Sequence, residues 1–308
     1  MKKKNGVVLF VTLMMILLLM SVVSIFLNKT KESKDKVTTI FAMTQTNAVM
    51  HNLLAYLNTL EFDEFMIFYA SQMAIPLNLG DSNIFFKLDS NQKNIGLNSL
   101  INASIKDNII SDQFIFLLLQ YKIQNPEFFL DLLKDTVDIE KNDALEESRN
   151  ASDSEIIIEY PIFRNGKIYN KIHLDMIIDY YFKETGDPEI YNFPFEKLFS
   201  FEDYPIDLNF ISLEIMGILF EDLNGYTITT INENEFVYEE MEDVPFDAYY
   251  RKKIDKGILG QSFTTKTKFL KIQITLIYLE QFESKISFKY DITSKKISDY
   301  TIEDILLK

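Results

Sequence analysis

The side chains best suited to catalysis are scarce in this 308-residue chain. It has no cysteine and only two histidines, His51 and His173. The lack of cysteine excludes thiolate catalysis, disulfides and cysteine-ligated metals. The sequence also has no His-Glu-x-x-His run, no Gly-x-Ser-x-Gly turn and no glycine-rich phosphate loop before a helix. We therefore expect packing or surface roles for both histidines and no catalytic residues, so the chain is not expected to be an enzyme.

Carboxylates are the one abundant group with possible metal chemistry. The chain has 46 acidic residues, and several of them gather around one segment with few apolar residues, 137–155. Oxygen ligands in a flexible loop suit Ca²⁺, which takes six to eight of them, although the spacing is not that of an EF-hand. The candidate calcium ligands are Asp135, Asp138, Glu140 and Asp143. The alternative is a solvated acidic loop that holds no ion.

The overall charge limits the partners of the chain. The formal net charge is −15, and the sequence pI is about 4.7. Such a surface repels nucleic acid and anionic lipid headgroups, so we expect no nucleic-acid binding. It suits cations or basic partner surfaces. The hydrophobic content of 47% is enough for a folded core.

The amino terminus predicts a membrane span. Residues 7–27 form an uncharged run of 21 residues after three lysines. At about 1.5 Å per residue, such a helix crosses the roughly 30 Å hydrocarbon core of a bilayer. The lysines predict a cytoplasmic amino terminus. We therefore expect a single-pass protein of the bacterial inner membrane with a periplasmic carboxy-terminal domain.

The short basic segment ahead of this span is more specific. Residues 1–6 end in Gly6 and directly abut the apolar helix. This arrangement resembles the leader of type IV pilin-like proteins, which a prepilin peptidase cuts just after the glycine. The resemblance implies cleavage between Gly6 and Val7, with N-methylation of the new terminal residue, Val7.

The remaining pattern predicts helices between two groups of strands. Helical spacing without Pro or Gly continues from the span to about residue 60, and alternation of apolar residues marks two strands near the carboxy terminus. Ser111 is a plausible N-cap for the helix over 112–123. Residues 95–100 read as a turn into irregular chain. The other expected elements are strands over 65–73, 83–88, 270–278 and 286–292, helices over 126–133, 172–183 and 210–223, and a hairpin connection over 280–285. This order suggests a helix-rich domain inserted into an α+β domain.

In the leader with Val11, and over residues 95–100, 133–138 and 206–216, the chain resembles the type II secretion minor pseudopilin family called general secretion pathway protein K. Most pilins carry a glutamate five residues after the cleavage point, whereas K-type proteins lack it, and this chain has Val11 there. Residues 95–100, with Asn98, look like the family's Phe-Asn-Leu-Asn-x-Leu segment. Residues 206–216, with Asn209, are similar to Ile-Asn-Val-Asn-Thr-Ala and the helix after it, although Phe210 replaces the threonine. Residues 133–138 match the family's Asp-Trp-Ile-Asp in part, without the tryptophan.

The resemblance implies an α+β fold. It consists of an N-terminal transmembrane and stem helix, a pseudopilin-like β-rich head and an inserted, mostly helical domain of sterile-alpha-motif-like type. It also implies calcium in the head, as seen in family members. The expected intervals are a leader over 1–6, a transmembrane helix over 7–27, a stem over 28–60, a head over 61–105 and 257–308, and an insertion over 106–256.

The resemblance also implies a role. K-type subunits sit at the tip of a short periplasmic pseudopilus with three other minor pseudopilins and initiate its assembly, for export of folded proteins across the outer membrane. The implied partners are those pseudopilins, the inner-membrane assembly platform and the prepilin peptidase. The sequence leaves other roles open: a competence pseudopilus that takes up DNA, a membrane-anchored periplasmic sensor or binding module, and, least favoured, a membrane-anchored enzyme.

Overall fold

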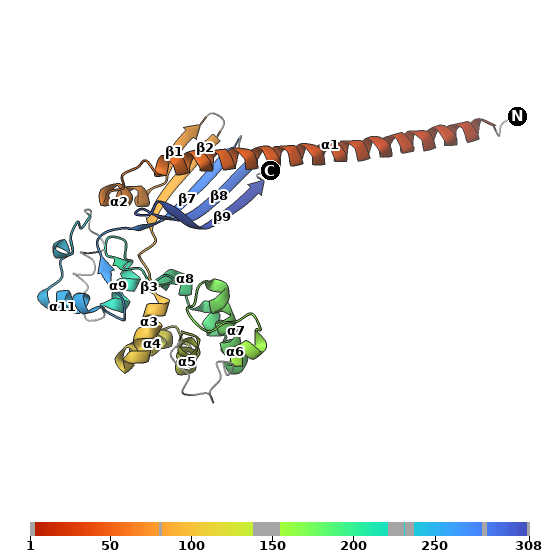
Figure 1. The fold of residues 1–308 in the computed structure, drawn as a ribbon. Helices are drawn as coiled ribbons and strands as arrows, with labels where there is room; N and C mark the ends of the chain where they lie inside the picture. The colour runs from red at the N-terminus through yellow and green to blue at the C-terminus, as the bar shows by residue number, and fades with distance from the viewer. Residues whose placement is uncertain are drawn as a thin grey trace.

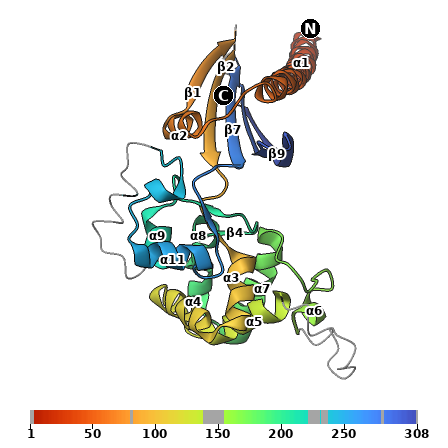
Figure 2. The same ribbon diagram turned by 60° about the vertical axis from the view of Figure 1, so that its left-hand side comes forward.

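The computed structural model describes residues 4–79, 82–137, 155–220, 231, 237–278 and 282–306. Figure 1 shows a long helix that lies across one face of an antiparallel sheet, with a second, helix-rich body attached to one end of that sheet. We call this second part the helical body. Figure 2 shows that two chain segments connect the sheet to the helical body.

The long helix, α1, spans Lys4–Leu57. At about 1.5 Å per residue, its 54 residues extend for roughly 80 Å. Its side chains are described from Met20 onward, with gaps, so most side chains of the predicted membrane span lie outside the described residues. A search of the described part of the chain finds no helix long and apolar enough to cross a membrane.

The sheet has five antiparallel strands in the order β1-β2-β7-β8-β9. Their bounds are β1 Ile75–Leu79, β2 Ser82–Ser90, β7 Phe269–Tyr278, β8 Phe282–Asp291 and β9 Lys296–Leu306. Alternating apolar residues form its inner face, where Leu88 pairs with Ile272 and Ile272 with Phe288. The carboxy-terminal part of α1 packs on this face through Met50 and Leu57.

The helical body starts after β2 and returns the chain to β7. Its longer helices are α3 Leu97–Lys106, α4 Asn108–Gln120, α5 Pro126–Val137, α7 Lys171–Thr185 and α11 Ala248–Lys256. Shorter elements complete it: β3 Ile95–Gly96, α6 Glu155–Glu159, η2 Pro188–Asn192, α8 Phe195–Leu198, β4 Phe199–Ser200, β5 Ile206–Asp207, α9 Leu213–Leu219, η3 Met241–Asp243 and β6 Phe263–Thr264. The pairs β3–β4 and β5–β6 are parallel.

The two parts have separate hydrophobic cores. The sheet core draws on residues from Met50 to Leu88 and from Leu270 to Tyr290, whereas the core of the helical body runs from Ile95 to Leu259. The insertion is therefore wider than the predicted interval of 106–256. Helix α3, which the sequence places in the head, packs in the helical body because Leu97, Leu100 and Ile101 join its core.

Several expected elements are wrong in type or extent. The predicted strand over 65–73 is a helix, α2 Glu64–Gln72, because the Asp63 side chain accepts a hydrogen bond from the Met66 N–H at 2.6 Å and caps it. Residues 95–100 form β3 and the first turn of α3 instead of irregular chain. Helix α4 begins at Asn108 with Asp107 as its cap, so Ser111 lies one turn inside the helix.

Other expectations are confirmed or corrected in detail. Helix α5 begins at Pro126, and α7 closes at Gly186, whose φ of 69° is the left-handed conformation that glycine favours. Helix α9 is shorter than predicted and starts after its cap, Ser212. Strand β8 already begins at Phe282, and the sequence reading missed the edge strand β9. The predicted acidic loop lies mostly outside the described residues.

Candidate functional site

The processing residues lie at the start of α1. Gly6, Val7 and Val11 belong to the helical backbone of α1, and their side chains lie outside the described part. The structure therefore places them on one helix without testing their roles, which remain predictions.

The predicted calcium ligands fall largely outside the described residues. Asp135 lies near the end of α5 and is exposed, while Asp138, Glu140 and Asp143 belong to the segment that is not described. Among the described residues, no group of three or more acidic or histidine side chains could hold a metal ion. Calcium binding in the acidic loop stays a prediction.

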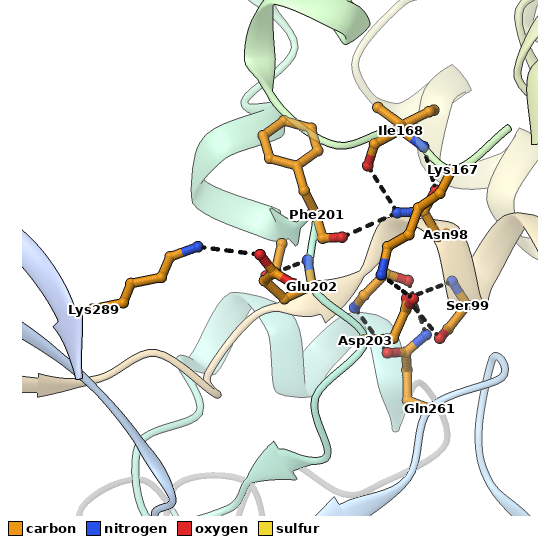
Figure 3. A network of polar contacts seen from close by, with 11 residues as sticks. Asn98, Ser99, Lys167, Ile168, Phe201, Glu202, Asp203, Gln261 and Lys289 are labelled. Atoms are coloured by element: carbon orange, nitrogen blue, oxygen red, sulfur yellow. Dashed lines mark hydrogen bonds and ion pairs between the residues drawn. The ribbon is translucent and has the colours of Figure 1, made fainter. Parts of the chain in front are cut away.

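Asn98 is buried at the start of α3 and binds two other segments of the helical body. Its amide NH₂ donates to the carbonyls of Ile168 and Phe201 at 3.0 and 3.1 Å. Its carbonyl oxygen accepts the Ile168 N–H at 2.8 Å. One side chain thus satisfies three backbone groups at the place where α3, the segment before α7 and the segment after β4 meet (Figure 3).

Asn209 has the same arrangement after β5. Its NH₂ group donates to the carbonyls of Tyr238 and Thr265 at 3.1 and 3.0 Å, and its oxygen accepts the Tyr238 N–H at 2.8 Å. Both asparagines singled out by the family motifs therefore join distant backbone segments. We call such a side-chain amide, bonded to backbone groups of another segment, an amide clamp.

Two glutamines form further amide clamps that sequence reasoning missed. Gln92 donates to the Pro205 carbonyl at 3.1 Å and accepts the Lys268 and Phe269 N–H groups at 2.5 and 3.0 Å. Gln261 accepts the Gly96 N–H at 2.8 Å and donates to the Gly96 carbonyl at 3.2 Å. No local pattern marks either glutamine, because their burial depends on segments far away in the sequence.

Charged groups surround these clamps. Asp203 accepts the N–H and hydroxyl of Ser99 at 3.0 and 2.9 Å and pairs with Lys167 at 2.9 Å. Lys289 of β8 reaches Glu202 at 3.6 Å and so links the sheet to the helical body (Figure 3). These pairs are partly exposed, so each contributes at most about 1 kcal/mol. They orient the clamped segments more than they stabilise them.

Asp207 is the fully buried acid of this region. Its carboxylate accepts hydrogen bonds from the hydroxyl of Thr267 and, at 3.0 Å, from the N–H of Asn209, while its own N–H donates to the Gln92 carbonyl at 2.7 Å. Burial raises the pKa of Asp207 to about 7, and these donors oppose the rise. Both of its oxygens meet donors from the chain itself, which fits a structural role.

A second acid, Glu64 of α2, faces the same place. One of its oxygens accepts the Thr267 N–H at 2.8 Å, whereas the other is buried without a hydrogen-bond partner. Burial raises the pKa of Glu64 as well, and its charge helps to raise the pKa of Asp207. Helix α2, strand β5 and the segment that leads into β7 are therefore tied together through Thr267. We call the four amide clamps with Asp207, Thr267 and Glu64 the joint.

The histidines lie apart from the joint and take the expected surface and packing positions. His51 is exposed on α1, and the ring of His173 packs edge-on against Phe163 with centroids 4.8 Å apart. Burial lowers the pKa of His173, which favours its neutral form.

Comparisons with known proteins support the fold. No protein-family model and no curated protein matches the chain. Among solved structures, a chain from the crystal structure of the GspK–GspI–GspJ complex of the enterotoxigenic Escherichia coli type 2 secretion system matches with a TM-score of 0.54 and 13% identity. The match covers 89% of this chain and 99% of that one. The chain therefore shares its fold with a chain of that complex. The resemblance inferred from the motifs is therefore confirmed at the level of the fold.

Asp207 makes the stability of the folded chain depend on pH. Its pKa is about 7 when folded, against a usual value of 3.8. Between these pH values the folded chain holds a proton on Asp207 that the unfolded chain has released. The contribution of this proton to the free energy of unfolding is therefore complete below about pH 4 and is lost as the pH rises toward 7. The variant Asp207→Asn is neutral at every pH and should lack this loss.

We compare the free energy of unfolding of the Asp207→Asn variant with that of the unsubstituted chain. From pH 4.5 to pH 7.5 this difference should shift in favour of the variant by at least about 1 kcal/mol. Urea unfolding in detergent micelles at both pH values measures this difference. Asp112→Asn, which changes an exposed acid of α4, is the matched control and should show little change. An equal stability difference at both pH values would show that Asp207 does not titrate in this range.

Proposed function

We propose that this chain is a minor pseudopilin at the tip of a type II secretion pseudopilus, where it initiates assembly for export of folded proteins across the outer membrane. The observation that carries the proposal is a nested architecture, in which α1 lies on the sheet and the helical body is inserted between β2 and β7. The same fold occurs in a chain of the GspK–GspI–GspJ complex over 89% of this sequence.

The position of the helical body fits the end of a filament. In Figure 1 this body lies away from the amino end of α1, beyond the end of the sheet. In a filament of parallel stems whose amino ends lie in the membrane, a further subunit stacked above would have to share this space. A subunit with such a bulky extension is therefore best accommodated at the tip.

The sequence of α1 supports the same position. A charged side chain in hydrocarbon costs about 2.5–3.5 kcal/mol on insertion scales. In ordinary pilins a glutamate is thought to offset this cost by pairing with the amino terminus of the neighbouring subunit above. A tip subunit has no such neighbour, so an uncharged residue such as Val11 is favoured there.

The proposal includes location and partners. The chain would cross the inner membrane once through residues 7–27, with its sheet and helical body in the periplasm. Its partners would be other minor pseudopilins, corresponding to GspI and GspJ of the E. coli complex, together with the assembly platform and the prepilin peptidase.

Processing of the leader tests whether the chain is a pseudopilin. We expect the chain recovered from native membranes to begin at N-methylated Val7 when the prepilin peptidase is present. In a peptidase-null strain it should keep Lys2 to Gly6. Intact mass and amino-terminal sequencing measure both states. A chain that keeps its leader in both strains would make residues 7–27 a permanent anchor and favour the sensor or binding-module reading.

The Val11→Glu variant tests the tip position. Because no subunit lies above a tip subunit, the new carboxylate would stay unpaired in hydrocarbon, and we expect fewer pseudopili than with the unsubstituted chain. Val11→Leu is the matched control and should leave assembly unchanged. Immunoblotting of the major pseudopilin in the sheared surface fraction measures assembly. More pseudopili with Val11→Glu would contradict the tip position.

A further inference from the structure

A mostly apolar cavity of about 280 Å³ lies in the helical body between α3, α4 and α9, and its lining residue Leu259 adjoins the Gln261 clamp. Its floor consists of buried core side chains, among them Leu100, Phe114 and Leu117. Phe116 and Leu213 also line it, although they are 52% and 48% exposed. An apolar cavity that continues into exposed apolar side chains is typical of a binding site.

Gly217, an exposed residue of α9, leaves one wall of this cavity open. It lies inside α9, where glycine costs about 1 kcal/mol relative to alanine. A Cβ atom added to Gly217 would have no neighbour within 4 Å, so packing within the chain does not require a glycine. Its φ is not positive either, so the backbone does not require one. A bare backbone at a cavity wall suits the close approach of another chain.

The rim of the cavity has one charged group among its lining residues, the carboxylate of Glu214. Glu214 pairs with Lys197 and accepts the Tyr121 hydroxyl at 2.7 Å, and these two contacts hold the pKa of Glu214 below its usual range. It is therefore ionised at neutral pH. A carboxylate has about four lone-pair sites, so Glu214 can accept a further cationic donor.

The volume of the cavity and the net charge of the chain together indicate what kind of group binds there. The volume lies at the lower edge of the roughly 300–1,000 Å³ range of small-ligand sites and is large enough for one aromatic or aliphatic side chain. The chain carries a net charge of −15, which favours a basic segment and disfavours a second copy of itself.

We propose that this cavity binds a large aromatic or aliphatic side chain of a partner protein, whose backbone crosses Gly217 and whose adjacent Lys or Arg pairs with Glu214. The proposal rests on the cavity alone and does not depend on the assembly role proposed above.

The test uses the full chain in nanodiscs, which keep free detergent out of the cavity. A 4-fluorophenylalanine label placed at Phe116 reports occupancy by ¹⁹F NMR. The probes are the peptides acetyl-Gly-Phe-Arg-Gly-amide, acetyl-Gly-Phe-Glu-Gly-amide and acetyl-Gly-Ala-Arg-Gly-amide. We expect a saturable shift with the Phe-Arg peptide and at least tenfold weaker binding of the other two.

Two variants connect binding to the cavity. Gly217→Leu places a side chain in the open space, so it should abolish the shift while the melting temperature is kept or raised. Glu214→Gln should remove the preference for Phe-Arg over Phe-Glu and so provides a second test if Gly217→Leu does not fold. Ile172→Ala changes an apolar residue of α7 that is 67% exposed and lies outside the cavity lining, and it should bind as before.

Three results would overturn the proposal. The first is no saturable shift with the Phe-Arg peptide at millimolar concentration. The second is binding that folded Gly217→Leu leaves unchanged. The third is a shift with octanoate but none with the peptide, which would make the cavity a site for acyl chains.

Discussion

The architecture depends on satisfying buried backbone polar groups where the chain leaves the sheet and returns to it. The insertion departs after β2 and comes back as β7, and these are neighbouring strands in which Ser90 pairs with Leu270. The crossing segments are not all in regular structure, so some of their N–H and C=O groups lack ladder partners. Each such group, if buried without a hydrogen bond, would cost about 1–3 kcal/mol. Three side-chain amides, Gln92, Asn209 and Gln261, supply partners for these segments, and Asn98 does the same for segments inside the helical body.

These bonds also give the helical body a defined position relative to the sheet. Gln92 holds the start of β7 to the segment that follows β2, and the ring of Tyr204 stacks on Phe269 with centroids 3.8 Å apart. Glu64 extends the contact to α2, which follows α1 in the chain. The sheet under α1 and the helical body are thus linked by several independent contacts. A fixed orientation of this kind is what the proposed tip role requires, because a loosely attached body would not define the end of a filament.

The sequence predicts the elements whose signals are local. Helix α5, which begins with a proline, helix α7, which ends at a glycine, and the alternating strand β7 were predicted because these signals depend on nearby residues. The strand expected over 65–73 failed because its apolar residues fit both a strand and a helix, and the cap at Asp63 decides for α2. The family motifs located Asn98 and Asn209 but gave no reason for them. Gln92, Gln261 and Asp207 were missed because their burial arises only when segments more than 50 residues apart meet.

Hydrogen exchange of the backbone amides bound by the clamps is the most direct test of this account. The N–H groups of Gly96, Ile168 and Tyr238 each donate to a clamp oxygen at 2.8 Å. If the clamps hold the joint, these three amides exchange as slowly as those of β7, and Asn98→Ala speeds exchange at Ile168 at least tenfold while amides of the sheet change little. Exchange of the three amides in the unsubstituted chain as fast as that of exposed loops would contradict the account.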